Sequence, residues 1–516
     1  MRVKRFLQNM AVGVGGQMFT YILQFISRTV FIYTLGKEYL GISGLFSNII
    51  GVLSVTELGL GAAVTFSLYA PLANDDKKRI NSIMRMLRRA YFLIGAFILA
   101  AGIILIPFLP YLMKKTTDLV NIPFIFMLYV IETVSSYWFC SYKSLIFNAD
   151  QKRYVVNLYS YFAKIIGTAC QIVVLFTLKS YVLYAIIGIL INILGNFMIA
   201  HRVDVCYPFL KEKAEPLPRA EKKEIYKNVI GTAAYKVNTM LINSTDNIVI
   251  SAFISIAAAG VYDNYYMISN SVFTFIRSLF TSATAGIGNF VAKEEKKQSE
   301  FLFRVMMFAM FWMFGFATIC LWVLLDPFIT LVWGDDFLLE KVVVVAIILE
   351  FLIKSFQVVT IVYKDACGLF WKGKYRPVAT MIINLAVSLL LVQKLGVLGV
   401  VLGTIASRLL TTWWFEPQLI YRNVFGMSCK MYFVRYFCAV AFVAVYIGIL
   451  EIISLPFTEA TFINLGIKSI LCLLIPNFFT WIFFRKTEEF TYLKNMISGT
   501  VNRVLRKGEK RRDVNG

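Results

Sequence analysis

Charged and polar side chains recur at helical spacing inside one of the first long apolar runs. Gln17, Thr20, Gln24 and Arg28 are three or four residues apart, which places them on one face of an α-helix. A charge at the centre of a membrane helix costs about 2.5 to 3.5 kcal/mol, so such side chains face water or a partner rather than lipid. Because a guanidinium group pairs with phosphate or carboxylate oxygens through two donors, the pattern predicts a cavity that binds an anionic ligand.

The same pattern returns 219 residues further along the chain. Lys236, Asn243 and Asp246 lie on one helical face, and the first two fall on Gln17 and Gln24. Both halves of the chain therefore present a polar face at equivalent places. We interpret this repeat as the sign of a transporter built from two halves.

Other charged residues inside apolar runs complete the predicted site. We expect the cations and two amides to bind substrate, namely Arg28, Lys236, Arg277, Lys143, Lys164, Gln24 and Asn243. The carboxylates would pair with these cations or bind a coupling ion such as H⁺ or Na⁺, and they are Glu57, Asp246 and Glu132. The arrangement predicts no catalytic residue and no metal site.

Several of these charges also have a purely structural interpretation. Lys143, Lys164 and Arg408 could lie near helix ends and extend their long side chains to the membrane surface. Glu350 and Lys354 are four residues apart and could neutralise each other. Arg28 and Arg277 could each neutralise a carboxylate, with Glu57 and Asp246 as the candidates.

The elements that must position these residues are membrane helices. With 59% hydrophobic and 16% charged residues, the chain falls in the membrane class. About fourteen runs are long enough to span a bilayer, so we expect an all-α integral membrane protein. Lys and Arg gather in alternate loops, which predicts that both termini are cytoplasmic and argues against binding of nucleic acid.

The repeat divides the chain into five parts. Because six helices repeat as six, the two lobes should be related by an axis along the membrane normal. The predicted parts are an N-lobe of six helices (1–200), a basic cytoplasmic linker (201–224), a C-lobe of six helices (225–422), two extra helices (423–484) and a basic cytoplasmic tail (485–516).

Motifs for other chemistries are missing from the sequence. It has no GxxxxGK[ST], HExxH or GxSxG motif, its eight cysteines form no CxxC pair, and His201 is its one histidine. We therefore expect no cofactor and no enzymatic activity. The predicted external loops are too short for the catalytic domain of an intramembrane glycan polymerase or ligase, and a non-transporting scaffold would not explain the repeated polar faces.

The stretch from Arg28 to Ala63 resembles the amino-terminal signature of bacterial polysaccharide flippases. The matching residues are the helix-1 arginine Arg28, Leu35-Gly36 before a short external turn, Tyr39 with Gly41, and Gly59-Leu60-Gly61. This family belongs to the multidrug/oligosaccharidyl-lipid/polysaccharide transporter superfamily. Its architecture of two six-helix lobes, a basic central loop and two extra helices is similar to the one expected here.

The resemblance implies a flippase of the bacterial plasma membrane that works by alternating access. Its cargo would be an undecaprenyl-diphosphate-linked oligosaccharide for O-antigen, capsule or another surface polysaccharide, and its partners would include the lipid bilayer and polymerases of the pathway. Arg28, Lys236 and Arg277 would meet the diphosphate or acidic sugars, and the two extra helices would offer a groove to the lipid tail. Alternatives are a lipid II flippase, which has a more cationic start, and a multidrug or cation antiporter, which typically has twelve helices.

Overall fold

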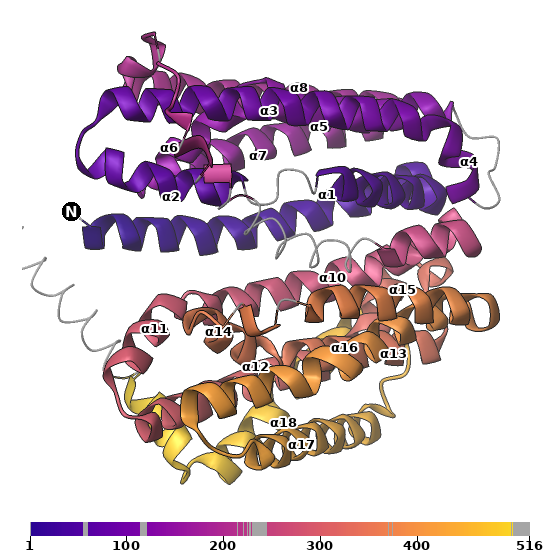
Figure 1. Cartoon of the computed structure of the whole chain (residues 1–516). Helices are drawn as coiled ribbons and strands as arrows, with labels where there is room; N and C mark the ends of the chain where they lie inside the picture. Colours follow the sequence, from indigo (N-terminus) through magenta and orange to yellow (C-terminus); the bar gives the residue numbers. More distant parts are fainter. Residues whose placement is uncertain are drawn as a thin grey trace, which may run out of the picture. The chain divides into compact units, whose positions relative to one another are not determined.

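The computed structural model of the chain is helical throughout its described part (Figure 1). It describes residues 2–54, 60–113, 121–213, 215–219, 221–223, 225–226, 229, 245–369, 371–373, 375–496 and 498, and no strand occurs among them. Glu57, Lys236 and Asn243 lie outside these ranges, as does most of the predicted span 225–252.

The chain forms two compact units. The first consists of residues 1–264 with 381–403, and the second of residues 265–380 with 404–516. These bounds cut through three helices and differ from those of the predicted lobes and linker, which stay a prediction.

Helices of the first unit pack as a bundle in which α1 lies along α7, α7 along α8, and α5 between α3 and α8. Gly102 of α3 permits a close approach to α5, because a Cβ there would lie 2.7 Å from a methyl carbon of Val130. The elements are α1 (Arg2–Leu53), α2 (Leu60–Ala73), α3 (Lys77–Leu105), α4 (Leu109–Leu112), α5 (Ile122–Trp138), α6 (Ser144–Ala149), α7 (Arg153–Leu178) and α8 (Tyr181–Cys206).

The first two predicted membrane spans, residues 8–35 and 39–70, meet inside α1. Gly36 has φ 84° and ψ −176°, a conformation that favours glycine, so α1 consists of two helices joined at this residue. The break falls at the Leu35-Gly36 pair, where the family resemblance implies an external turn.

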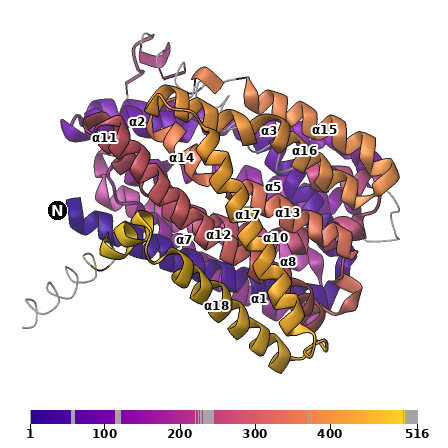
Figure 2. The same ribbon diagram turned by 90° about the horizontal axis from the view of Figure 1, so that it is seen from below.

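In the second unit, the long helix α12 is the centre of the packing. It contacts α13, α14, α17 and α18, and its buried Phe303 packs against the rings of Tyr363 and Phe425 (Figure 2). The elements are α10 (Ile256–Thr281), α11 (Thr284–Lys293), α12 (Lys296–Trp333), α13 (Lys341–Ser355), α14 (Val358–Ala366), α15 (Arg376–Leu395), α16 (Val397–Ile420), α17 (Lys430–Ser454) and α18 (Phe462–Phe484).

The described residues contain ten helices that are long and apolar enough to cross a membrane, or eleven if the bent pair α5 and α6 counts as one. The second predicted span, 39–70, is divided by the undescribed residues 55–59, and the seventh, 225–252, lies largely outside the described part. The eighth, 257–291, corresponds to α10 and α11. An all-α membrane protein is confirmed, and about fourteen helices fit this arrangement.

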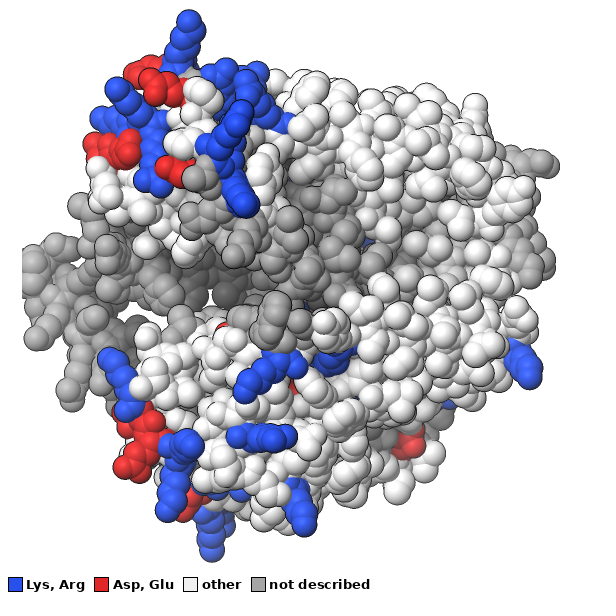
Figure 3. All heavy atoms as spheres, viewed as in Figure 1, with Lys and Arg blue, Asp and Glu red and all other residues white. Residues whose placement is uncertain are grey.

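Charge is distributed as a membrane protein requires. On the face in Figure 3, the Lys, Arg, Asp and Glu side chains of the first unit gather at the end where α2 joins α3. The rest of that unit's visible described surface carries almost no charge. The first turns of α3 supply Lys77, Lys78 and Arg79, and such a basic end is typical of a cytoplasmic loop.

Two cysteines test the packing of an extra helix on the second unit. The thiols of Cys320 on α12 and Cys472 on α18 are within hydrogen-bonding reach of each other. In a variant that keeps only these two cysteines, copper phenanthroline should therefore form a disulfide. After denaturation, a maleimide should then label neither cysteine, whereas a variant that keeps Cys320 and the exposed Cys438 of α17 should be labelled at both. Equal labelling of the two variants would contradict the packing of α12 on α18.

A labelling experiment also tests the predicted orientation. Cys206 ends α8 and is exposed, and Cys429 precedes α17. Because both lie in loops predicted to be cytoplasmic, a membrane-impermeant maleimide should label them only in permeabilised cells. Labelling of either cysteine in intact cells would overturn the orientation.

Candidate functional site

The first unit contains a cavity of about 410 Å³. Both parts of α1 contribute to it, because Gln24, Ser27 and Arg28 precede the break at Gly36 whereas Ser43 and Asn48 follow it. Most of the lining side chains are polar, and the full lining is Gln24, Ser27, Arg28, Phe31, Leu40, Ser43, Gly44, Ser47, Asn48, Lys164, Thr168, Gln171, Tyr184 and Asp263. Three predicted substrate-binding residues, Gln24, Arg28 and Lys164, therefore meet in one polar cavity.

Arg28 is held by a network of polar contacts at the cavity wall. Its Nη2 lies 2.8 Å from Oδ2 of Asp263, and its Nε donates to Oδ1 of Asn264 at 2.6 Å. The amide of Asn247 donates to the other oxygen of Asp263 at 3.0 Å. Side chains of Arg28 and Asp263 are 14% and 18% exposed, so the pair is only partly desolvated. No described residue accepts a hydrogen bond from Nη1 of Arg28, which leaves that nitrogen able to bind a ligand oxygen.

Among the described residues, the carboxylate that neutralises Arg28 is thus Asp263. Glu57 lies outside the described residues. Asp246 is buried, and the hydroxyl of Tyr262 donates to it at 3.3 Å. Next to Asp246, the hydroxyl of Thr245 donates to Asn384 at 3.2 Å.

The wall opposite α1 comes from α7 and α8. Lys164, Thr168 and Gln171 on α7 lie about one helical turn apart, so they face the cavity together. Gln171 donates to the backbone oxygen of Tyr184 on α8 at 3.1 Å. Lys164 is exposed, and it provides a second cation beside Arg28.

Three other predicted site residues do not line this cavity. Lys143 lies 2.6 and 2.7 Å from the two carboxylate oxygens of Asp204 on α8. Glu132 is half-buried on α5. Arg277 belongs to the second unit, where it is exposed on α10 without an ion-pair partner among the described residues.

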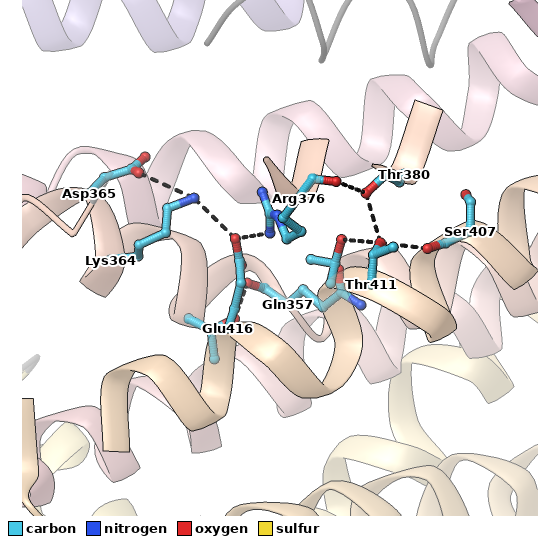
Figure 4. A network of polar contacts seen from close by, with 10 residues as sticks. Gln357, Lys364, Asp365, Arg376, Thr380, Ser407, Thr411 and Glu416 are labelled. Atoms are coloured by element: carbon cyan, nitrogen blue, oxygen red, sulfur yellow. Dashed lines mark hydrogen bonds and ion pairs between the residues drawn. The ribbon is translucent and has the colours of Figure 1, made fainter. Parts of the chain in front are cut away.

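The second unit contains a buried ion-pair network that the sequence analysis did not assign. Lys364 of α14 lies 3.0 Å from Glu416 of α16, and Arg376 of α15 contacts the same carboxylate oxygen (Figure 4). The side chain of Glu416 is 0% exposed and that of Lys364 is 5% exposed. Nearby, the hydroxyls of Thr380 and Thr411 are 2.7 Å apart. This network ties three helices of the unit together.

Two further charges in membrane spans have partners in the second unit. Arg408, which stands nearly alone in the sequence, lies 3.0 Å from Glu350. Lys354 donates to Asn270 at 3.3 Å and its ammonium lies 4.2 Å from the ring centroid of Phe273. Arg408 and Glu350 thus neutralise each other across α16 and α13.

Sequence reasoning missed the roles of Asp263 and Glu416. Both had the signal of a carboxylate inside an apolar run, where an unpaired charge is costly. Their partners are 235 and 52 residues away, so helical spacing could not reveal the pairing. Among the described residues, no group of three or more His, Cys, Asp and Glu side chains could hold a metal ion.

Three solved structures with a similar fold are distant from this chain in sequence. The inward closed conformation of the lipid II flippase MurJ superposes with a TM-score of 0.67 at 14% identity, covering 92% of this chain and 99% of that chain. An inward-facing multidrug resistance MATE family transporter of the MOP superfamily superposes with a TM-score of 0.58 at 14% identity, covering 77% of this chain and 94% of that chain. A mutant of the Vibrio cholerae MATE transporter VcmN superposes with a TM-score of 0.55 at 13% identity, covering 82% of this chain and 98% of that chain.

A model of one protein family matches more than half of the sequence. No curated protein matches the chain by sequence. Residues 6–285, which include most of α1 with Arg28 and all of the cavity lining, match the family described as polysaccharide biosynthesis protein. With its helical fold shared with membrane transporters, the chain therefore belongs to the polysaccharide biosynthesis protein family.

Proposed function

We propose that the protein flips an undecaprenyl-diphosphate-linked oligosaccharide across the bacterial plasma membrane, for synthesis of a surface polysaccharide such as O-antigen or capsule. The observation that carries this proposal is the polar cavity that brings Arg28 and Lys164 together in a membrane protein of this family. Two cations beside a polar wall suit a ligand with a diphosphate group and sugar hydroxyls. Flipping needs no covalent chemistry from the protein.

Arg28 exchanges partners when cargo binds. In this structure Asp263 neutralises its charge, and Asn264 accepts a hydrogen bond from its Nε. A diphosphate can bind at the free Nη1 and then replace Asp263, whose other oxygen keeps the hydrogen bond from Asn247. Amide and hydroxyl groups of Gln24, Ser43 and Asn48 line the same cavity and can bind sugar hydroxyls. Binding thus replaces one set of charge-assisted contacts with another.

A second cavity suits the lipid tail. It has a volume of about 320 Å³ and lies among α12, α17 and α18, with apolar residues such as Phe308, Phe316 and Phe442 along its wall. The last two helices are the extra helices of the predicted architecture. An apolar groove on these helices can shelter part of a polyprenyl chain, since tail and wall are both apolar.

Lipid II is the alternative cargo, and the fold shared with MurJ over 92% of this chain is the observation in its favour. Deleting the gene in its host distinguishes the candidates. Accumulation of an undecaprenyl-diphosphate-linked oligosaccharide on the cytoplasmic side, with loss of a surface polysaccharide, is the expected result. Accumulation of lipid II would favour the alternative. An unchanged lipid pool with lost drug resistance would replace both with an antiporter.

A further inference from the structure

Glu132 is a carboxylate in the membrane interior that the flipping of cargo does not use. It is the eleventh residue of α5, which starts at Ile122, and therefore lies about 15 Å along the helix. That distance is about half of a bilayer's hydrocarbon thickness. The side chain is half-buried, and no described residue forms an ion pair or hydrogen bond with its carboxylate.

Among the residues that the structure describes, the surroundings of Glu132 supply hydroxyl and amide groups but no adjacent cation. On α5 itself, the hydroxyl of Tyr129 is hydrogen-bonded to Ser43 of α1 and Tyr181 of α8. Tyr184 of α8 also interacts electrostatically with Glu132. On the side of α3, the stretch that packs near Glu132, between Tyr91 and Leu105, has no charged residue. The charged groups of α1 and α7 on this side, Arg28 and Lys164, lie at the cavity beyond Tyr184 and Gln171.

Gly188 of α8 leaves a small space between Glu132 and Gln171, a residue of the cavity lining. A Cβ on Gly188 of α8 would lie 3.6 Å from Oε1 of Glu132 and 3.3 Å from Nε2 of Gln171. The carboxylate and the amide therefore converge on the same small space, and the missing side chain of Gly188 keeps it open. Gln171 also lines the 410 Å³ cavity, so it stands between that cavity and the carboxylate.

We infer that Glu132, behind Gln171 at the back of the cavity, is a proton-binding site that couples flipping to the proton gradient. An ionised carboxylate at this depth without a cation is costly, so the group binds H⁺ and is neutral when the cavity is closed to water. Water in the cavity allows the proton to leave through the space between Gly188 and Gln171. Na⁺ is the other coupling ion that a carboxylate can bind, and the gradient experiment below distinguishes it from H⁺.

The proton site can be tested without cargo. Infrared difference spectra of the purified protein, recorded while pH is raised, should show loss of a protonated-carboxyl C=O band, and Glu132→Gln should lack that band. Glu350→Gln is the matched control, because Glu350 is a span carboxylate held in an ion pair with Arg408. The control should keep the band. Absence of the band in the native protein, or its persistence in Glu132→Gln, would overturn the site.

Coupling is tested in proteoliposomes, and this step rests on the proposed flippase function. The probe is the lipid-linked oligosaccharide isolated from the deletion strain. One proton per cargo makes a gradient of one pH unit worth about a tenfold accumulation ratio. Glu132→Gln, which imitates the protonated acid, should still equilibrate the probe but reach a ratio of about 1. A tenfold ratio in this variant, or stimulation by a Na⁺ gradient instead, would overturn the coupling. If the native protein moves no probe while the infrared band is present, the proposed cargo fails and the proton site stands.

Discussion

Replacing Arg28 with alanine should abolish transport while the protein stays in the membrane. Arg28 makes charge-assisted contacts with Asp263 and Asn264 and is proposed to make equivalent ones to the cargo diphosphate. Loss of two such bonds at about 1.5 kcal/mol each corresponds to roughly a 100-fold loss of transport. Arg28→Lys should recover only part of it, because lysine keeps the charge but lacks the planar set of donors. The measurement is transport in proteoliposomes together with membrane abundance.

Asp263 distinguishes cargo binding from a structural ion pair. Asp263→Asn should keep transport, since it frees Arg28 from its competitor, and Arg28→Ala with Asp263→Asn should remain inactive. Tyr33→Ala is the control for altering α1, because Tyr33 is 68% exposed on the same helix and does not line the cavity. Recovery of transport in the double variant would mean that Arg28 only neutralises Asp263.

Sequence periodicity could predict the polar cavity because helical spacing depends on local geometry alone. Gln24 and Arg28 are four residues apart, so they share a helical face in any packing, and both line the same cavity. The turn at Gly36 follows instead from the family resemblance, in which Leu35-Gly36 precedes a short external turn. Helical spacing within one apolar run does not show which of the charged residues line the cavity and which do not. Lys164 faces it, whereas the equally plausible Lys143 is paired with Asp204.

The repeat predicts equivalent lysines but not their partners. Tyr142-Lys143 and Tyr363-Lys364 correspond at an offset of 221 residues, and each lysine pairs with a carboxylate on the last helix of its predicted lobe, Asp204 on α8 or Glu416 on α16. The acids themselves do not correspond. Adding the offset of 220 that relates Arg202 to Arg422 takes Asp204 to position 424, which is valine. Packing and not sequence register selects the acid, and for that reason the ion pairs were missed.

Replacing Glu416 with alanine should cause the largest loss of stability. Its carboxylate is 0% exposed and accepts from both Lys364 and Arg376, so alanine leaves two cations without their shared partner (Figure 4). Removing one member of a buried ion pair costs about 3 to 5 kcal/mol. Thermal unfolding in detergent and membrane abundance measure the effect. Arg28→Ala should cost less, because Asp263 is 18% exposed at a polar cavity and keeps its contact with Asn247.

Asp204→Ala is the matched control for Glu416→Ala, because it breaks the corresponding contact of Lys143. That pair is more exposed, at 16% and 21%, so solvent can compensate more of the loss and the fall in stability should be smaller. Glu416→Gln combined with Lys364→Met should recover part of the stability, since only Arg376 then faces an uncharged acceptor. Equal stability of Glu416→Ala and Asp204→Ala would contradict the structural role of Glu416. Lost transport with unchanged stability would instead place Glu416 in the transport cycle.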